Sequence, residues 1–190
     1  MKTIEQVLSI FPETTKENWH QHINGKGWVY VTAHVQETAY VGEDALVSGN
    51  ARVSGNARVF DDARVSGNAR VSGNAQVYDY AQVYGNARVS GEARVFGDAQ
   101  VYGNALVYGE AQVYGDAWAL SPLYIQGSRH AVSLASYSEI TIGCHTWSIQ
   151  YWKDNYKEIG EQERYSTQQI EEYLSYILLC EQYVARYAKK

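Results

Sequence analysis

Three arginines at one fixed spacing are the residues with the clearest chemical potential in this sequence. Arg52, Arg70 and Arg88 recur at every eighteenth position. A guanidinium group is permanently charged, and its planar fork of N–H donors matches phosphate and carboxylate groups. Guanidinium groups held close together repel one another unless an anion lies between them. The spacing therefore indicates a solvated basic face, a contact with acidic side chains of a neighbouring subunit, or a binding site for an anion.

Other residues could complete such a binding site. Arg58 and Arg94 form a second basic pair, and nearby tyrosines could stack on a nucleotide base. Outside the regular part of the chain, basic and aromatic residues also gather in the segment 118–150. The complete predicted ligand-binding set is Arg52, Arg70, Arg88, Arg58, Arg94, Tyr84, Tyr102, Tyr108, Arg129, His145 and Trp147. The predicted ligand is a small anionic molecule of the nucleotide type.

Residues for catalysis or metal binding are sparse. Zinc-dependent hydration chemistry requires three histidines that converge on one metal, whereas His20 and His22 have no apparent third partner. Cys144 precedes His145, a pair that could bind a metal but that also suits simple packing. We therefore predict no metal, no cofactor and no enzymatic activity. The alternative enzymatic hypothesis is an acyltransferase with His34 or His145 as general base.

A six-residue period positions the candidate residues. Alanine recurs at every sixth position from Ala33 to Ala117, and a valine follows two residues after each alanine from Val35 to Val113. The unit V-[SYF]-G-[NDE]-A-[RQL] combines a short alternating strand with the Gly-Asn chemistry of a turn. Such a chain buries its alanine and valine side chains by coiling on itself, with three hexads and therefore three strands in each coil. Residues three hexads apart are then expected to stack into columns.

This pattern resembles the hexapeptide-repeat family of left-handed parallel β-helices, in which an aliphatic residue occupies the first position and a small residue the fifth. The resemblance covers about half of the chain. It implies a homotrimer with parallel axes, in which the columns line clefts between subunits. Many relatives are acyltransferases whose loops project from the coil, but the fifteen consecutive hexads contain no inserted loop.

The segment that begins I-G-C-H-T-W-S-I-Q-Y-W-K-D-N-Y resembles the end of uncharacterised hexapeptide-repeat proteins of bacteriophages and prophages. This resemblance implies a phage origin, and with it a role in sequestering a nucleotide signal of a host defence pathway. Two other function classes stay open at this point: a structural or interaction scaffold without a ligand, and the acyltransferase.

The sequence divides into four predicted segments. They are an N-terminal helical cap (1–26), a hexapeptide-repeat β-helix (27–120), a last irregular coil (121–146) and a C-terminal helical segment (147–190). Helices are expected at 4–10, 15–23, 147–159 and 167–188. The last of these follows Ser166 and Gln169, which form a capping-box signal.

Composition narrows the function classes. The chain has 190 residues, a net charge of −5, and no apolar run long enough to cross a membrane. The negative charge argues against general nucleic-acid binding, and two cysteines cannot build a disulfide framework. Without a recognisable secretory signal, the protein is expected in the cytoplasm, which would be that of the host if a phage encodes it.

Overall fold

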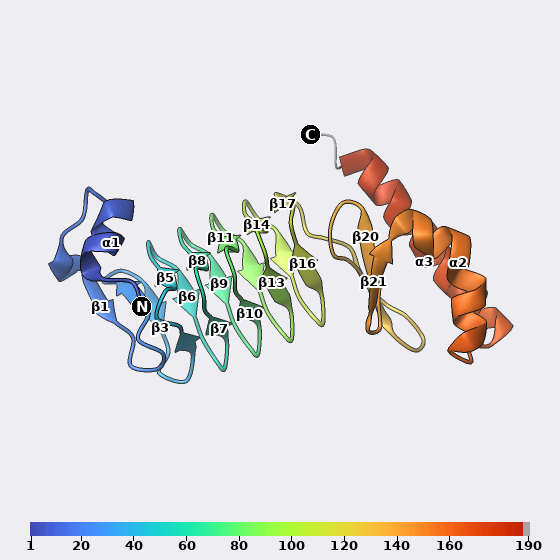
Figure 1. Cartoon of the computed structure of the whole chain (residues 1–190), viewed down its shortest axis with the longest axis horizontal. Coiled ribbons are helices and arrows are strands. Elements are labelled where there is room, and N and C mark those ends of the chain that lie inside the picture. The colour runs from blue at the N-terminus through green and yellow to red at the C-terminus, as the bar shows by residue number, and fades with distance from the viewer. Residues whose placement is uncertain (188–190) are drawn as a thin grey trace. The chain divides into compact units, whose positions relative to one another are not determined.

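The structure is a computed structural model that describes residues 1–187 (Figure 1). The chain forms two compact units, Met1–Ser121 and Pro122–Lys190.

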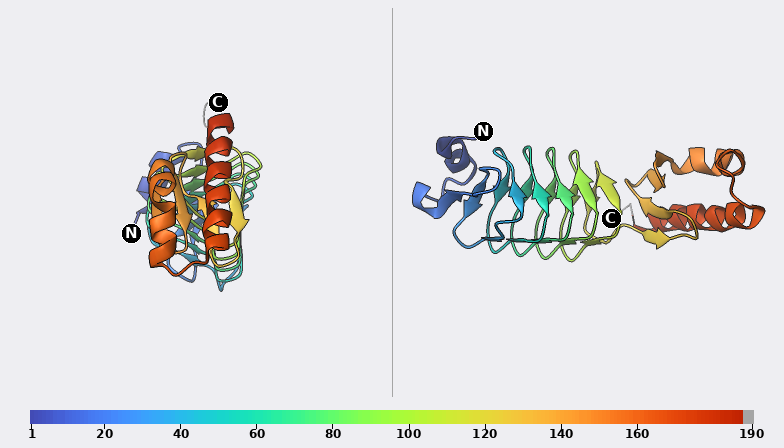
Figure 2. Two further views of the ribbon diagram at one scale, coloured as in Figure 1. Left: turned by 90° about the vertical axis from the view of Figure 1, so that its right-hand side faces the viewer. Right: turned by 90° about the horizontal axis from the view of Figure 1, so that it is seen from below.

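The first unit is a parallel β-solenoid in which each coil contributes one strand to each of three sheets (Figures 1 and 2). We name them the arginine sheet, the aromatic sheet and the third sheet. The arginine sheet has the order β15-β12-β9-β6-β3 and consists of β3 (His34–Val35), β6 (Arg52–Val53), β9 (Arg70–Val71), β12 (Arg88–Val89) and β15 (Leu106–Val107). The aromatic sheet has the order β16-β13-β10-β7-β4 and consists of β4 (Tyr40–Val41), β7 (Arg58–Val59), β10 (Gln76–Val77), β13 (Arg94–Phe96) and β16 (Gln112–Tyr114).

The third sheet is extended at its N-terminal edge by an antiparallel strand, β1, which pairs with β2. Its order is β1-β2-β5-β8-β11-β14-β17, with β1 (Trp19–Gln21), β2 (Trp28–Tyr30), β5 (Leu46–Val47), β8 (Arg64–Val65), β11 (Gln82–Val83), β14 (Gln100–Val101) and β17 (Ala117–Trp118). The solenoid strands pair in parallel with strands three hexads away, for example Arg52 with Arg70. The predicted parallel β-helix with three hexads in each coil is therefore confirmed.

The core of the solenoid consists of the alanines and valines of the repeat. From Val41 to Val113 each valine of the repeat is at most 1% exposed, and the alanines from Ala39 to Ala111 are equally buried. Burying one valine side chain contributes about 1.5–3 kcal/mol. Small side chains on all three inner faces keep the coil narrow, so functional groups must project outward from the sheets.

The turns between successive strands, which we call corners, have a backbone conformation that explains why two aspartates can replace glycine in the repeat. Asp61 and Asp79 have φ angles of 53° and 56°, in the left-handed region that the corner glycines also adopt. The Asp79 carboxylate accepts a hydrogen bond from the backbone N–H of Gly97 at 3.1 Å. Asn and Asp tolerate this backbone region better than other residues. These departures from the repeat therefore serve the turn.

The N-terminal cap is only partly helical. Helix α1 spans Ile4–Ile10 as predicted, but the predicted helix at 15–23 is a short 3-10 turn, η1 (Lys16–Asn18), followed by β1. Val7, Trp19 and Leu46 form a buried cluster beneath α1. Pairing with the exposed edge of β2 satisfies the backbone of residues 19–21, which explains why a strand replaces the last turns of the predicted helix.

The second unit begins with an antiparallel sheet in place of the predicted last coil at 121–146. Its strands are β18 (Tyr124–Gln126), β19 (Ala131–Leu134), β20 (Glu139–Ile142) and β21 (His145–Ser148), and all neighbours are antiparallel. The alternating apolar runs were identified correctly, but their connections are short turns. Gly143, with φ 60°, begins a two-residue hairpin between β20 and β21. Such turns reverse the chain, whereas parallel pairing requires a crossover.

Two helices complete the second unit. Helix α2 (Ile149–Gln162) begins after Ser148, whose side chain accepts a hydrogen bond from the Tyr151 backbone. The predicted helix start at 147 is therefore two residues early, because residues 147 and 148 belong to β21. Helix α3 (Thr167–Tyr187) has the predicted Ser166–Gln169 capping box. Its predicted last residue, 188, and the end of the segment 147–190 lie outside the described residues. No helix among residues 1–187 is long and apolar enough to cross a membrane.

Candidate functional site

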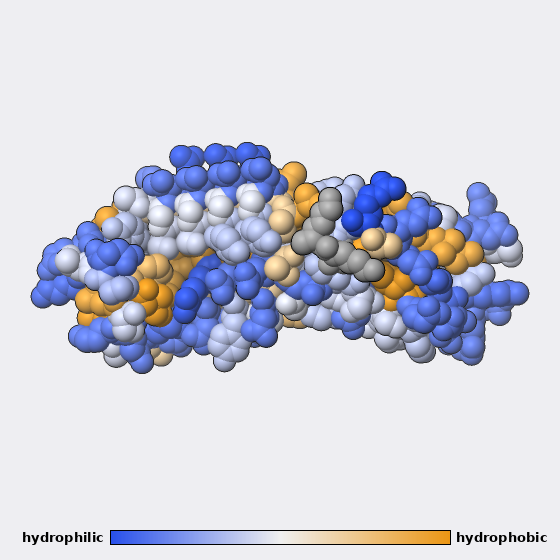
Figure 3. Space-filling model, turned by 90° about the horizontal axis from the view of Figure 1, so that it is seen from above, coloured by the Kyte–Doolittle hydropathy of each residue, from blue (hydrophilic) through white to orange (hydrophobic). Residues whose placement is uncertain are grey.

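The arginine column runs along the outer surface of the arginine sheet. His34 is in register with Arg52, Arg52 with Arg70, and Arg70 with Arg88, and Leu106 ends the column. All five side chains are exposed. Neighbouring strands are about 4.8 Å apart. The backbone positions of successive arginines in the column are therefore separated by this distance. The stacking that the three-hexad interval predicts is present. Figure 3 shows rows along the solenoid in which successive residues have the same hydropathy colour, as stacked columns of like residues would produce.

The arginines of this column have no anionic partner within residues 1–187. Arg52, Arg70 and Arg88 form no ion pair or hydrogen bond through their side chains with the described residues. Arg58 differs, because its guanidinium carbon lies 5.2 Å from the Tyr40 ring centroid and 5.1 Å from that of Phe60. Contacts of this kind stabilise a cation at a surface. The column therefore carries charge that the solenoid itself leaves uncompensated.

A shallow groove lies alongside the column. Its volume is about 440 Å³, and its lining consists of Asn68, Arg70, Asn86, Arg88, Asn104 and Leu106. The Asn68 amide donates a hydrogen bond to the Asn86 side-chain oxygen at 3.3 Å, so the corner amides bond along the stack. The groove thus combines permanent cations with neutral amides, which is the donor set that phosphate oxygens accept.

Arg58 and Arg94 lie on a different sheet from the column. They are separated by Gln76 on the aromatic sheet, beside the column of Phe60, Tyr78, Phe96 and Tyr114. The Phe60 and Tyr78 rings stack at 5.0 Å with an interplanar angle of 5°. Because the rings cover one another's faces, they present mainly their edges to solvent. Burial raises the pKa of Tyr78 above that of an ordinary tyrosine.

The three candidate tyrosines do not lie together. Tyr84 and Tyr102 stack on each other at 5.1 Å, and the Tyr84 hydroxyl donates to Gln100 on the third sheet at 3.2 Å. The corner at Gly85 and Asn86 separates Tyr84 from the arginine sheet, and the corner at Gly103 and Asn104 separates Tyr102 from it. Tyr108 alone follows a strand of the arginine sheet, and its side chain is 47% exposed. Of the three, Tyr108 is the one that lies next to a strand of the arginine sheet.

The remaining candidates belong to the second unit, and Arg129 lies at the C-terminal end of α2. The Arg129 guanidinium donates to the carbonyl oxygens of Glu163 at 2.9 Å and Arg164 at 3.2 Å, and lies 4.7 Å from the Tyr165 ring centroid. Such bonds satisfy carbonyl groups that the helix end leaves without partners. Arg129 is thus occupied in capping α2.

His145 lies near the same helix end, whereas Trp147 packs on Tyr151 and Trp152 in the first turn of α2. Their rings stack at 4.5 Å, and His145 Nε2 lies 3.8 Å from a carboxylate oxygen of Glu163. Burial raises the pKa of the neighbouring Tyr165 to about 12. The described residues contain no group of three or more His, Cys, Asp and Glu side chains that could hold a metal ion.

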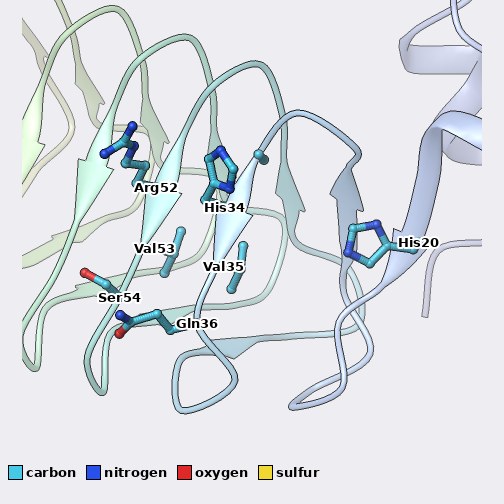
Figure 4. A pocket seen from close by; sticks show the side chains of 8 residues that line it. His20, His34, Val35, Gln36, Arg52, Val53 and Ser54 are labelled. Carbon is cyan, nitrogen blue, oxygen red and sulfur yellow. The ribbon is translucent and has the colours of Figure 1, made fainter.

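A second groove lies at the first coil, and the sequence did not predict it. Its volume is about 660 Å³, and His20, His34, Gln36, Arg52 and Ser54 contribute side chains to its lining (Figure 4). His20 reaches this position because β1 folds back along β2. No periodic signal marks that reversal, since β1 precedes the repeat.

Comparison with known proteins identifies the repeat. Segments 45–61, 51–66, 63–79, 81–97 and 99–115 match the family model described as YdcK Beta solenoid repeat. The comparisons with curated proteins and with solved structures gave no significant match. Together with the parallel pairing of the solenoid strands in three sheets, the matched segments show that the chain contains a repeat β-solenoid.

Proposed function

We propose that the solenoid is a non-catalytic binding scaffold whose arginine sheet holds a small phosphate-bearing ligand of the nucleotide type. The observation that carries the proposal is that the arginine column has no anionic partner among residues 1–187. Two unit charges about 4.8 Å apart in water repel by about 0.9 kcal/mol, and fanning of the side chains reduces this cost further. An anion between neighbouring guanidinium groups would replace this repulsion with a net attraction.

The groove suits a ligand with more than one anionic group. Arg70 and Arg88 are in register one coil apart, so they could engage one phosphate together or two linked phosphates separately. The corner amides of Asn68, Asn86 and Asn104 line the same groove. Beyond Arg88 the column ends at Leu106, which is 41% exposed. This gradient from charged to apolar fits a molecule that has phosphates at one end and a base at the other.

The absence of catalysis is part of the proposal. An acyl transfer mechanism requires a general base close to a bound acceptor and a loop that holds the acyl donor. The repeat has no inserted loop, and the groove beside Arg70 and Arg88 has no histidine or carboxylate in its lining. These features favour binding over turnover.

Self-association into a homotrimer is also proposed. The aromatic column is only partly buried in the single chain, so parallel association of copies could cover it and place the arginine sheets beside clefts. Native mass spectrometry of gently purified protein should show a trimer, with retained ligand as additional mass. A monomer that carries ligand would refute the trimer but not the binding site.

The decisive experiment compares two pairs of substitutions with the same charge change. The repeat itself has glutamine at the equivalent strand position in Gln76, Gln82 and Gln100, so Arg70→Gln with Arg88→Gln should fold. Arg58→Gln with Arg94→Gln removes two charges from the aromatic sheet and serves as the control. Calorimetric titration would use ATP, GTP and inorganic tripolyphosphate at low and at physiological salt.

We expect the Arg70→Gln and Arg88→Gln double variant to bind these probes at least about tenfold more weakly, since charge-assisted hydrogen bonds contribute more than about 1 kcal/mol each. The control should retain wild-type affinity. Equal losses of affinity in both double variants would show that binding depends only on the net charge of the protein. A wild-type protein that binds none of the probes would overturn the proposal in favour of a structural scaffold.

A further inference from the structure

The first coil of a solenoid has a backbone edge that needs a partner. Along the arginine sheet, N–H groups donate toward the next coil: His34 to the Ala51 carbonyl and Gln36 to the Val53 carbonyl, both at 2.9 Å. The carbonyl groups of the first coil therefore point the other way, out of the N-terminal end. An uncovered edge of this kind can pair with another strand.

Two of the three first-coil strands are covered at this edge by the chain itself. Strand β1 pairs along β2 on the third sheet. On the aromatic sheet, the Ala39 carbonyl oxygen lies 3.0 Å from His22 Nε2, and the Val41 carbonyl accepts the N–H of Gly27 at 2.8 Å. Residues 19–27 thus protect both edges.

The third strand, β3, is not covered by any segment of residues 1–187. Neither the Ala33 carbonyl nor the Val35 carbonyl receives a hydrogen bond from residues 1–187. Val35 is also only partly buried, whereas the repeat valines from Val41 to Val113 are at most 1% exposed. Backbone acceptors and an apolar core side chain are therefore available at one place.

This edge forms the floor of the first-coil groove. Ala33, His34, Val35 and Gln36 line it, together with residues of β1 and β6. Figure 4 shows His34 and Arg52 on adjacent strands, with His20 on the opposite wall from β1. The groove has two imidazoles and one guanidinium in its lining but no carboxylate. Its charge complements an acidic partner.

We propose that the edge of β3 binds an extended peptide segment of a partner protein, which adds one parallel strand to the arginine sheet. Continuing the register of the solenoid fixes the pattern of that segment. A residue aligned with His34 donates its N–H to the Ala33 carbonyl, and the residue two positions later donates to the Val35 carbonyl. The residue between them points inward and covers Val35.

The side chains of the partner follow from this register. The residue aligned with His34 continues the column toward Arg52, so an acidic side chain fits there. The inward residue must be small and aliphatic, as at every other coil, and the next residue lies in the column of Gln36 and Ser54, where a polar side chain fits. The partner segment therefore reads acidic, aliphatic, polar. Strand addition of this kind obtains affinity from main-chain bonds and specificity from alternate side chains.

Another solenoid of the same kind stacked end to end is a poorer occupant. Its last strand on this sheet is β15, and the Leu106 N–H already donates to the Ser121 hydroxyl at 2.9 Å. That N–H is therefore not available to pair with the carbonyls of β3.

The test uses the peptide acetyl-Ala-Glu-Val-Ser-Gly-amide, titrated into isotopically labelled full-length protein up to millimolar concentration. Backbone amide resonances of residues 33–36 report binding. We expect saturable shifts at these residues, and about fivefold weaker binding when lysine replaces glutamate in the peptide. N-methylation of the glutamate and serine nitrogens should abolish the shifts, because it removes both donors.

A charge exchange provides the matched control. The His34→Glu variant should prefer the lysine peptide, whereas Arg94→Glu, which adds an acid on the aromatic sheet, should behave as wild type. The Arg70→Gln and Arg88→Gln double variant should also bind the peptide normally, which separates this proposal from the phosphate site. Absence of saturable shifts at residues 33–36, or equal binding of the N-methylated peptide, would overturn the proposal.

Discussion

Two corner glycines of the same coil should respond very differently to alanine. Gly91 and Gly97 occupy successive corners, with φ angles of 74° and 61°. A Cβ atom at Gly91 would lie 3.0 Å from both the backbone nitrogen and the carbonyl oxygen of Gly109, in the coil above. A Cβ atom at Gly97 would have no atom closer than 3.8 Å, where the Tyr114 Cβ lies.

The magnitude follows from two separate costs. An alanine in the left-handed region costs about 1–2 kcal/mol at either site. Gly91→Ala adds a backbone clash, and overpacking of this kind costs about a further 1–3 kcal/mol. We therefore expect Gly97→Ala to destabilise the solenoid by about 1–2 kcal/mol and Gly91→Ala by about 2–5 kcal/mol. For a chain of this size, 1 kcal/mol shifts Tm by about 2–4 °C.

The assay is thermal and urea unfolding of full-length protein, followed by the β-sheet circular dichroism signal. Because both sites belong to one coil, fraying of the solenoid ends affects them alike. Gly97→Asp provides a third measurement: its carboxylate should accept the Gly115 N–H, as Asp79 accepts that of Gly97, and should recover part of the loss. Equal destabilisation by Gly91→Ala and Gly97→Ala would refute the argument that coil stacking excludes a Cβ at Gly91.

Three further predictions concern the second unit. Cys180 is fully buried and burial raises its pKa to about 12, so iodoacetamide at pH 8 should label exposed Cys144 alone in native protein and both cysteines after unfolding; labelling of native Cys180 would contradict this. An unfolded thiol ionises near pH 8.5, whereas the buried Cys180 thiol stays protonated well above that pH. The contribution of Cys180 to the free energy of unfolding is therefore full below about pH 8.5 and should decline as the pH rises above it. Arg129→Gln should destabilise the second unit by about 1–2 kcal/mol through loss of the carbonyl bonds at the end of α2 and the contact with Tyr165, measured as faster amide exchange in α2; unchanged exchange would show that the cap is not energetically significant.

The sequence predicted the solenoid well because its period is itself a structural constraint. Alanine at every sixth position leaves one inward-facing set of side chains, and three hexads per coil fix which residues become neighbours. The stacking of Arg52 on Arg70 and of Phe60 on Tyr78 could be derived this way. The capping box of α3 was also recognisable, since it depends only on local hydrogen bonds between Ser166 and Gln169.

Prediction failed where the chain reverses direction. The apolar runs of residues 121–146 alternate as they do in the repeat, but only pairing with neighbours decides whether they continue the coil or fold back. The same holds for residues 19–21, whose helical pattern yields to pairing with β2. The predicted ligand-binding set is also divided by the structure. Tyr84 and Tyr102 lie across a corner from the arginine column, and Arg129 caps a helix in the second unit.

The sequence by itself determined the coil, its core and the columns on its surface, because each of these follows from spacing along the chain. Only the tertiary structure decided which residues of the column have partners and which backbone edges are covered. The covering of those edges depends on how residues 19–27 fold, and these residues precede the regular repeat. For this reason the open edge of β3, between His20 and His34, has no signature in the repeat.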